Sequence, residues 1–458
     1  MSELGSPERP LRVAVVGSGP SGFYAAEYLF KQAGLTVEVD MFDRLPTPFG
    51  LVRGGVAPDH DKIKSVTKVY DKTAAREGFR FYGNVALGED LSIDDLRGHY
   101  HAVIMAVGAQ TDRALGIPGE DLLGSHAATE FVGWYNGHPD YKHRQFDLSA
   151  ERVVVVGVGN VAMDVARILA KTCAELVSTD IADYALDALD LSRVREIVML
   201  GRRGAAQAAF TPAELKEFGE LADADVIVTP DDAALDALSA AALKLKPDRD
   251  VEKNLTLLGE YAQRPPSGKN RRIILRFLTS PVEIVGTQKV EGVKIVRNVL
   301  SQKSDGSLAA QATDQTEIIP CELVFRSVGY KGVPLDGLPF DAKSGIIPNQ
   351  DGRVTDTPGF YAVGWIKRGP SGVIGTNKPD SILTVESLLA DFRAGILDRD
   401  TDSRAALEGV LGERGTQFVT FSDWQRLDVL EQEAGAKLGR PRLKFTDVSK
   451  MLEALNTP

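Results

Sequence analysis

Two glycine-rich segments, each placed directly after a short apolar run, constrain the fold of this chain more than any other feature. The first is Gly17-Ser18-Gly19-Pro20-Ser21-Gly22, after residues 11–16, and the second is Gly157-Val158-Gly159-Asn160-Val161-Ala162, after residues 153–156. Such glycines permit a tight turn and let a pyrophosphate approach free N–H groups at the start of a helix. One match would be weak evidence, but two matches after β-branched runs predict two dinucleotide-binding units.

The residue that ends the next predicted strand discriminates between nucleotides. After the first motif, the predicted strand 36–42 is followed by Asp43, which lies 21 positions beyond Gly22. A carboxylate at this place accepts hydrogen bonds from a ribose diol and repels a 2′-phosphate. The pattern therefore favours FAD or NAD, and the plainer alternative is that Asp43 is only a polar residue at a strand end.

The second motif is followed by arginines instead of an acid. The predicted strand 196–200 leads into Gly201, Arg202 and Arg203. Two guanidinium groups can hold a 2′-phosphate through charge-assisted hydrogen bonds, which favours NADP over NAD. Arg202 lies 40 positions after Ala162, not the usual ~20, and an inserted segment over 174–193, with a helix near 180–189, would account for the excess.

Composition and charge exclude several other classes of protein. With 458 residues the chain exceeds one ordinary core, so two nucleotide-sized domains are expected. The net charge of −11 and the lack of a long basic run argue against binding to nucleic acid. No apolar stretch reaches membrane-spanning length, and the ten residues before the first strand are too short and polar for a signal or transit peptide. A cytoplasmic protein without a membrane partner is expected.

The cysteine count narrows the chemistry further. Cys173 and Cys321 are the two cysteines, and they form no Cys-x-x-Cys pair. A redox dithiol, a cysteine-ligated iron–sulfur cluster and a cysteine zinc site are therefore excluded, and no metal site is expected. A disulfide reductase and a glutamate-synthase-like small subunit, which need such cysteines, are not favoured.

Several segments carry predictions of local structure. Residues 44–59 form a loop rich in proline and glycine, too long to be a neutral connection. Residues 61–76 are predicted to form one surface helix, and residues 230–246 one solvated helix. The tail after Asp400 contains enough apolar residues to dock as helices on the core: Phe418, Phe421, Trp424 and Leu427.

The loop Leu45–His60, with the sequence LPTPFGLVRGGVAPDH, resembles the signature loop of adrenodoxin-reductase-type ferredoxin–NADP reductases. The chain is most similar to the bacterial members, with Asp43 where a glutamate is common and Val158 where an asparagine often stands. The resemblance spans nearly the whole chain and is weaker in 220–265 and in the tail. The other matching segments are 106–110, 157–167, 201–204, 277–281 and 364–377.

A third strand–turn–helix pattern, over 359–375, lacks dinucleotide spacing and is best explained as the completion of the first domain. We therefore predict an α/β protein with two Rossmann-like dinucleotide-binding domains, the NADP domain being inserted in the FAD domain, as in glutathione-reductase-like architectures. The predicted parts are 1–110 (FAD, first part), 111–328 (NADP) and 329–458 (FAD, second part, with the helical tail).

The resemblance implies the residues that contact each cofactor. Non-covalent FAD is expected at the first motif and at scattered later positions: Gly17, Gly19, Pro20, Ser21, Gly22, Asp43, Leu51, Val85 and Arg113. The isoalloxazine is expected against Trp365, Gly372, Val373 and Ile374. NADP(H) is expected at Gly157, Gly159, Asn160, Val161, Ala162, Arg202, Arg203 and Glu214.

Two residues are candidates for a catalytic role. The resemblance places His60 and Glu214 near the point where nicotinamide meets flavin. A histidine titrates near neutral pH and suits steering or proton relay, whereas a packing or helix-start role is the plainer alternative. Glu214 follows Thr211-Pro212, so stabilisation of a helix start explains it nearly as well. Asp164 is expected to be structural.

The predicted function is electron transfer from NADPH through FAD to a ferredoxin-type iron–sulfur protein, one electron at a time. Other NADPH-dependent flavin oxidoreductases or diaphorases, a flavin monooxygenase and a non-catalytic flavin-binding protein are the alternatives. An acidic ferredoxin surface is expected to meet basic residues, which are otherwise a solvated face: Lys269, Arg271, Arg272, Arg440, Arg442 and Lys444.

Overall fold

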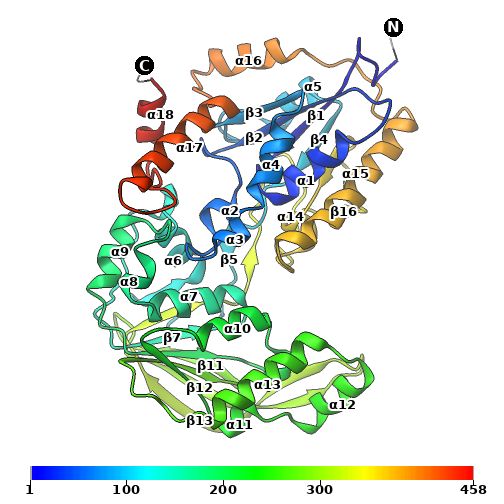
Figure 1. The fold of residues 1–458 in the computed structure, drawn as a ribbon. Coiled ribbons are helices and arrows are strands. Elements are labelled where there is room, and N and C mark those ends of the chain that lie inside the picture. The colour runs from blue at the N-terminus through cyan, green and yellow to red at the C-terminus, as the bar shows by residue number, and fades with distance from the viewer. Residues whose placement is uncertain (1–2, 457–458) are drawn as a thin grey trace. The chain divides into compact units, whose positions relative to one another are not determined.

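The computed structural model describes residues 3–456, which fold as two compact units (Figure 1). The first unit comprises the residues up to Thr111 and from Gly329 onward, and the second comprises Asp112–Val328. The second unit is therefore an insertion in the chain of the first. A two-stranded sheet of β5 (Thr111–Asp112) and β15 (Tyr330–Lys331) joins the two crossing segments.

The first unit is built on a seven-stranded sheet whose central strands are parallel. Strand β1 is buried along its whole length, as expected for a strand covered on both faces. It pairs with β2 on one side and with β4 on the other, so the strand order reverses at β1 and places a topological switch point there. In spatial order the strands are β16 (Asn349–Gln350), β17 (Arg353–Val354), β18 (Phe360–Ala362), β4 (Ala102–Met105), β1 (Leu11–Val16), β2 (Val37–Asp43) and β3 (Phe79–Gly83).

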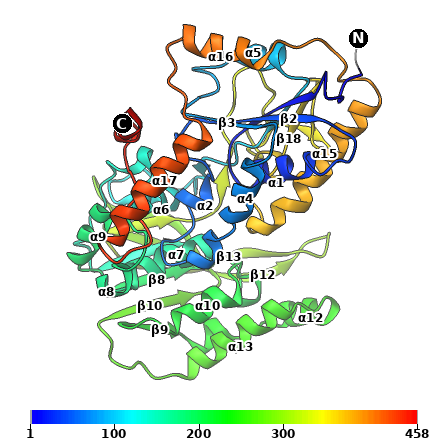
Figure 2. The same ribbon diagram turned by 45° about the horizontal axis from the view of Figure 1, so that its top comes forward.

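Helices cover both faces of this sheet. Helices α1 and α15 lie side by side on one face (Figure 2), and buried residues of α5 and α16 pack on the other. The helices of the unit are α1 (Pro20–Leu29), α2 (Leu51–Gly54), α3 (Asp61–Lys64), α4 (Thr67–Ala74), α5 (Ile93–His99), α14 (Trp365–Arg368), the 3₁₀ turn η3 (Ile374–Thr376), α15 (Asn377–Arg393), α16 (Arg404–Glu413), α17 (Phe421–Ala436) and α18 (Val448–Asn456).

The prediction of a single surface helix over 61–76 is wrong. The segment forms the two helices α3 and α4, separated at Ser65 and Val66. Tyr70 is buried and stacks on Phe23 of α1 with ring centroids 4.8 Å apart. Burial of this aromatic ring turns α4 toward the core. One continuous helix over 61–76 would instead run along the exposed surface.

The second unit contains a six-stranded parallel sheet. Helices α7, α10 and α13 pack on one face, and a three-stranded antiparallel sheet covers the other. In spatial order the strands are β6 (Ser125–Ala127), β14 (Leu323–Arg326), β7 (Arg152–Val156), β8 (Glu196–Leu200), β10 (Arg271–Arg276) and β9 (Ala224–Val228), and the antiparallel strands are β11 (Thr279–Val285), β12 (Gly292–Gln302) and β13 (Leu308–Pro320). The helical elements are α6 (Ala128–Tyr135), η1 (Pro139–Tyr141), α7 (Asn160–Ala170), α8 (Cys173–Leu176), α9 (Asp183–Asp190), η2 (Ala205–Gln207), α10 (Pro212–Phe218), α11 (Pro230–Ala233), α12 (Ala237–Leu245) and α13 (Arg249–Gln263).

The solvated helix predicted over 230–246 is also two helices, α11 and α12. Asp236 begins α12, because its carboxylate accepts a hydrogen bond from the Ser239 N–H at 2.9 Å. Asp232 is buried and accepts a hydrogen bond from the Phe277 N–H at 2.8 Å. This anchored carboxylate holds α11 against the sheet and accounts for the break.

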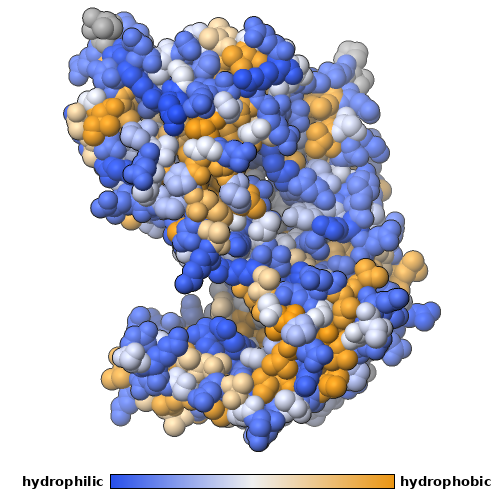
Figure 3. Space-filling view, turned by 180° about the vertical axis from the view of Figure 1, so that it is seen from behind, coloured by the Kyte–Doolittle hydropathy of each residue, from blue (hydrophilic) through white to orange (hydrophobic). Residues whose placement is uncertain are grey.

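The described part of the chain contains no helix that is both long enough and apolar enough to cross a lipid bilayer. The face drawn in Figure 3 is largely hydrophilic, with apolar side chains gathered in separate patches. Both cysteines are free thiols.

The C-terminal tail docks on the first unit as helices, as predicted, and carries a buried acid. Trp424, Leu427 and Glu431 share the buried face of α17. The Glu431 side chain is 1% exposed; it accepts hydrogen bonds from Arg53 at 2.8 Å and from Arg442 at 3.1 Å. Burial alone would raise the pKa of Glu431, but the two guanidinium groups outweigh it and lower the pKa.

We expect Glu431→Gln to lower the unfolding free energy of the first unit by about 3 kcal/mol, because it leaves two partly buried guanidinium groups without their shared counterion. Denaturant unfolding followed by tryptophan fluorescence measures the change. Since the folded-state pKa is lowered, the ion pair stabilises fully above the ordinary glutamate value of 4.5 and is lost as the pH falls through the lowered pKa.

Glu433→Gln is the matched control, since Glu433 lies two positions further on the same helix and is exposed. It should change stability by less than about 0.5 kcal/mol. Equal effects of the two substitutions would contradict the role given to Glu431.

Candidate dinucleotide-binding sites

The first glycine motif forms a tight turn between β1 and α1 in which each glycine has a different role. Gly17 has a φ of +105°, and a Cβ on it would lie 2.4 Å from the carbonyl oxygen of Ala106. A Cβ on Gly22 would lie 2.4 Å from the Gly17 carbonyl oxygen, so only glycine lets the helix approach the strand this closely. A Cβ on Gly19 would meet nothing within 4 Å. The turn thus leaves open space beside the N-terminus of α1, where a pyrophosphate would bind.

Pro20 and Ser21 complete this helix start. Pro20 occupies the first helical position, where its missing N–H costs no hydrogen bond. The Ser21 carbonyl accepts a hydrogen bond from the Ser381 hydroxyl at 3.0 Å, which ties α1 to α15.

Asp43 ends β2 beside the same turn, as predicted. Its carboxylate accepts hydrogen bonds from the Ser18 N–H at 3.1 Å and the Leu45 N–H at 3.0 Å, and a third from the Ser18 hydroxyl. Burial raises the pKa of Asp43, and these hydrogen bonds oppose the rise. An ionised carboxylate offers about four acceptor sites, so the fixed group retains capacity for a ribose hydroxyl.

The signature loop packs directly on the glycine turn. The Phe49 N–H donates to the Ser18 carbonyl at 3.0 Å, and a Cβ on Gly50 would lie 3.1 Å from the Gly19 Cα. Leu51 follows at the start of α2 and is 40% exposed, so its side chain is available to a ligand. On its other side the loop is held by the tail, since Phe49 makes an edge contact with Trp424 at 5.8 Å.

The third glycine-rich segment also belongs to the first unit. The Gly364 N–H donates to the Asp380 carboxylate at 2.7 Å, and a Cβ on Gly364 would lie 2.1 Å from the Ser21 Oγ. The segment therefore lies against the first helix start. Trp365 begins α14, and its Nε1–H donates to the Ser371 carbonyl at 3.2 Å. The Trp365 indole thereby helps to hold the following glycine turn.

Gly372, Val373 and Ile374 form the turn that precedes α15. Gly372 has a φ of +79°, which favours glycine, and the Val373 side chain is 54% exposed. An exposed apolar side chain on a fixed turn suits contact with a flat aromatic ligand.

The remaining predicted residues near the first site have different environments. The Val85 side chain is buried and its N–H donates to the Asp43 carbonyl at 2.9 Å, so Val85 supports Asp43 and offers no side chain to a ligand. Arg113 belongs to the second unit, which begins at Asp112. The His60 carbonyl accepts from the Ile63 N–H at 3.0 Å, which fixes the end of the signature loop at the start of α3.

The second glycine motif forms an equivalent turn between β7 and α7. A Cβ on Gly157, whose φ is +139°, would lie 2.2 Å from the Ser327 carbonyl oxygen, whereas a Cβ on Gly159 would meet only Ala209 at 4.0 Å. Ala162 is fully buried under the strand. The Asn160 side chain accepts a hydrogen bond from the Thr211 N–H at 2.9 Å, and Val161 is partly buried against the core.

Arg202 and Arg203 follow β8 beside this turn and differ from most arginines of the unit. Both side chains are exposed. Within residues 3–456 neither guanidinium has a hydrogen-bond or ion-pair partner, while the Arg202 and Arg203 carbonyls accept hydrogen bonds from Asn298 and Leu278. The backbone is thus fixed and both charges are available to an anionic ligand.

Glu214 has a strong structural partner. Its carboxylate accepts a hydrogen bond at 2.8 Å from Arg167, which is fully buried and also pairs with Asp164 at 2.6 Å and Glu217 at 3.3 Å. The Thr211 hydroxyl accepts a hydrogen bond from the Glu214 N–H at 3.4 Å, so Thr211 is the cap. Asp164 has the structural role that was expected.

Three structurally important acids escaped the sequence analysis: Glu431, Asp380 and Asp232. A signal for Glu431 was present, because Trp424, Leu427 and Glu431 recur at helical spacing and place the acid on an apolar face. Asp380 lies one turn into α15 and also pairs with Lys367 at 3.0 Å, a contact that only the tertiary structure brings about.

Comparisons with known proteins agree with this geometry. Residues 11–202 match the model of the pyridine nucleotide-disulphide oxidoreductase family. The chain is 48% identical over 456 residues to the NADPH-ferredoxin reductase FprA of Mycobacterium tuberculosis, covering 97% of this chain and 99% of that protein. It is 42% identical over 462 residues to human mitochondrial NADPH:adrenodoxin oxidoreductase, covering 98% and 92%. The structure of M. tuberculosis FprA in complex with NADPH superposes with a TM-score of 0.93, at 47% identity, covering 98% of this chain and all of that one.

These similarities span both units. The chain belongs to the adrenodoxin-reductase-type family of NADPH-ferredoxin reductases. The predicted family and the predicted pair of Rossmann-like domains are confirmed.

We expect Gly19→Ala to weaken retention of the dinucleotide at the first turn without lowering the stability of the cofactor-free chain. The added methyl group meets no protein atom within 4 Å and the φ of −78° suits alanine, so only the ligand would be displaced. Flavin absorbance after gel filtration measures retention.

Gly22→Ala is the contrasting variant, since its methyl group would lie 2.4 Å from a backbone oxygen. It should destabilise the chain with or without a cofactor. A Gly19→Ala protein that retains flavin as well as the parent would show that the pyrophosphate does not approach this residue.

Proposed function

We propose that this chain passes electrons from NADPH through FAD to a ferredoxin-type iron–sulfur protein, one electron at a time. The observation that carries the proposal is the difference between its two glycine turns. The first is followed by a fixed carboxylate, and the second by two exposed guanidinium groups that have no hydrogen-bond or ion-pair partner among residues 3–456. The names of the relatives, NADPH-ferredoxin reductase and NADPH:adrenodoxin oxidoreductase, support the same activity.

The residues of the first turn fit FAD. Gly17, Gly19 and Gly22 give a turn open toward a pyrophosphate, and Asp43 retains acceptor capacity for the ribose. Bound FAD would supply the conversion between hydride transfer and single-electron transfer. The protein's part is to fix these contacts before the cofactor arrives, and Val373 and Trp365 would limit the access of water on the side of the ring.

The residues of the second turn fit NADPH. Gly159 would bring the pyrophosphate to the start of α7, and Arg202 and Arg203 would hold the 2′-phosphate. At roughly 1.5–3 kcal/mol for each charged hydrogen bond, the pair favours NADPH over NADH by about 10²- to 10⁴-fold.

His60 and Glu214 divide the remaining roles. We assign His60 to steering of the nicotinamide, because the carbonyl contact at the start of α3 fixes its backbone and an imidazole ring can both donate and accept a hydrogen bond. We assign Glu214 to positioning, because its carboxylate is already paired with the buried Arg167.

A disulfide reductase, which the name of the matching family model raises, is not supported. Attack on a disulfide requires a thiolate with a lowered pKa. Burial instead raises the pKa of Cys173 to about 11 and that of Cys321 to about 12. Both thiols are protonated at neutral pH, so neither supplies the thiolate that such an attack requires.

The partner proposed here is a ferredoxin with an acidic surface. Of the six basic residues considered for its contact, only Arg272 is exposed. Lys269 and Arg271 donate to backbone carbonyls, Arg442 pairs with Asp428, and Lys444 donates to the Arg53 carbonyl. Arg272 in turn pairs with Glu196 at 2.7 Å, so the steering charge would come chiefly from basic residues outside this set.

We expect Arg202→Gln together with Arg203→Gln to raise the Michaelis constant for NADPH by at least about 100-fold and to leave that for NADH nearly unchanged. Loss of both charges removes the groups that would hold the 2′-phosphate. Steady-state ferricyanide reduction with each coenzyme measures the two constants.

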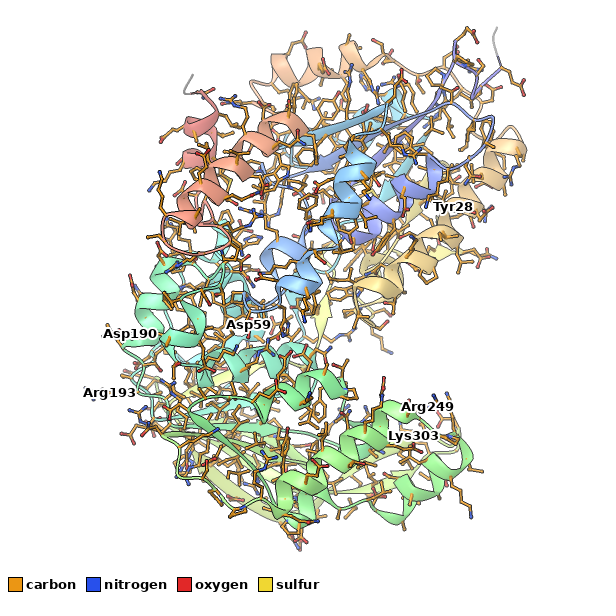
Figure 4. The ribbon with its side chains drawn as sticks, viewed as in Figure 1. Tyr28, Asp59, Asp190, Arg193, Arg249 and Lys303 are labelled. Carbon is orange, nitrogen blue, oxygen red and sulfur yellow. The ribbon has the colours of Figure 1, made fainter. Side chains whose placement is uncertain are left out.

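Arg249→Gln is the control, since Arg249 (labelled in Figure 4) is another exposed arginine of the second unit, at the start of α13. It should change neither constant. If the double substitution affected NADPH and NADH equally, the arginine pair would not be the phosphate site.

Turnover with a ferredoxin should fall steeply as salt rises from low ionic strength, because screening weakens long-range attraction between unlike charges. Ferricyanide reduction by the same protein, which needs no protein docking, should change little. Stopped-flow or steady-state rates over a salt series test this, and a flat response with ferredoxin would exclude electrostatic steering.

A further inference from the structure

The segment 277–281 connects β10 of the parallel sheet to β11 of the antiparallel sheet. At its second residue, Leu278, φ is +51°, in the left-handed region that disfavours a leucine. A residue keeps such a conformation only where its surroundings fix it, and residues of this kind cluster at functional sites. The contacts of Leu278 therefore indicate what its conformation serves.

Leu278 forms backbone hydrogen bonds on both sides. Its N–H donates to the Arg203 carbonyl at 2.9 Å, and its carbonyl accepts from the Asn298 N–H at 2.7 Å. The N–H of the next residue, Thr279, donates to the Gly201 carbonyl at 2.9 Å. The segment therefore runs beside the loop that follows β8, and its left-handed residue holds the backbone of one of the two arginines in that loop.

Asn298 holds the other arginine of the loop. It is 3% exposed, and its side-chain amide donates to the Arg202 carbonyl at 2.8 Å and to the Ser280 hydroxyl at 2.8 Å. The pairing of β12 with β13 shifts register between Val296 and Asn298, and an irregularity of this kind re-aims a side chain. One buried residue is thus bonded directly to Arg202 and, through its own N–H, to the residue that holds the second arginine.

The loop is fixed at its two ends as well. The Gly201 N–H donates to the Arg276 carbonyl at 2.8 Å, and the Gly204 N–H donates to the Gln207 side chain at 3.1 Å. The side chains of both arginines nevertheless stay exposed. A rigid backbone beneath two exposed charges is the arrangement expected where the position of those charges matters to a ligand.

The position of a guanidinium group decides how well it recognises a phosphate. The pair forms two parallel hydrogen bonds, which demand a defined geometry, and binding groups need to be held within about 0.5 Å of that geometry. A hydrogen bond to the Arg202 carbonyl restrains the backbone from which the side chain projects. The second glycine turn is closed by a different contact, from the Gly157 N–H to the Leu200 carbonyl at 3.0 Å. Loss of the Asn298 amide should therefore disturb the arginines and spare the turn.

We propose that Asn298 is a positioning residue that sets how strongly the second unit prefers a coenzyme with a 2′-phosphate. It holds the Arg202 carbonyl directly and the Arg203 carbonyl through Leu278. Its own amide is buried and already bonded, so it acts through the two arginines. This role rests on the proposed function, because it takes Arg202 and Arg203 as the ligands of the 2′-phosphate of NADPH.

The test is the binding of NADP⁺ and of NAD⁺ to the oxidised, FAD-loaded protein, measured by isothermal titration calorimetry and expressed as the ratio of the two dissociation constants. Asn298→Ala removes the amide that holds the Arg202 carbonyl. We expect it to weaken NADP⁺ binding about 10-fold or more and to change NAD⁺ binding less than about 2-fold, because the charged hydrogen bonds to the 2′-phosphate are the contacts that it misplaces.

Asn254→Ala is the matched control. Asn254 is another asparagine of the second unit that is 3% exposed, and its amide donates to the Phe210 carbonyl at 3.0 Å. Its replacement removes a buried amide of the same kind and should leave the ratio at the parent's value. Asn298→Ser, smaller and still polar, should lower the preference for NADP⁺ in the same direction, and it carries the test if Asn298→Ala does not fold.

A combined variant separates this proposal from the function on which it rests. With Arg202→Gln and Arg203→Gln in place, Asn298→Ala should change the ratio no further, because the groups that it positions are gone. If the two arginine substitutions lower the preference but the Asn298 variants keep the parent's ratio, or weaken NADP⁺ and NAD⁺ equally, the positioning role alone is overturned. If the arginine substitutions leave the ratio unchanged, the assignment of the 2′-phosphate fails, and the positioning role with it.

Discussion

The buried contact between Glu431, Arg53 and Arg442 links the last part of the chain to the first nucleotide turn. Arg53 belongs to the signature loop, and Phe49 of that loop donates its N–H to Ser18 within the turn. The tail therefore supports the first glycine turn through the signature loop, although the tail contributes no residue to that turn. A charge cluster of this kind is costly to bury and stabilises only when all its members are present. The shape of the first glycine turn thus depends on Glu431, which lies more than 400 positions further along the sequence.

The second unit is organised around a buried charge as well. Arg167, on the helix that follows the second glycine turn, pairs with Asp164 of the same helix and with Glu214 and Glu217 of α10. In each unit an internal ion cluster supports the element behind the turn, while the groups left for ligands are a carboxylate in one and guanidinium groups in the other. The two units thus have the same arrangement around the glycine turn, but the charge available to a ligand is negative in the first and positive in the second.

Much of this organisation was readable in the sequence, because it rests on local rules. The strands beside both glycine motifs, the carboxylate at Asp43 and the arginines after β8 follow from hydrophobic runs and spacing. The breaks within 61–76 and 230–246 did not follow, since they depend on Tyr70 stacking on Phe23 and on Asp232 reaching the Phe277 N–H. The intramolecular contacts of Lys269, Arg271 and Arg442 could not be predicted either. The sequence does not show which carbonyl or carboxylate a basic side chain will bind in the folded protein. The ligand contacts of His60 and Glu214 stay predictions.

The points at which the chain leaves and re-enters the first unit explain how its sheet tolerates so long an insertion. Strands β5 and β15 pair with each other, so the points where the chain leaves and re-enters the first unit are adjacent. A module whose two ends meet can be spliced into a host between neighbouring residues without tearing the host's sheet. The seven-stranded sheet takes no strand from residues 112–328, so its hydrogen bonding is complete without the inserted unit.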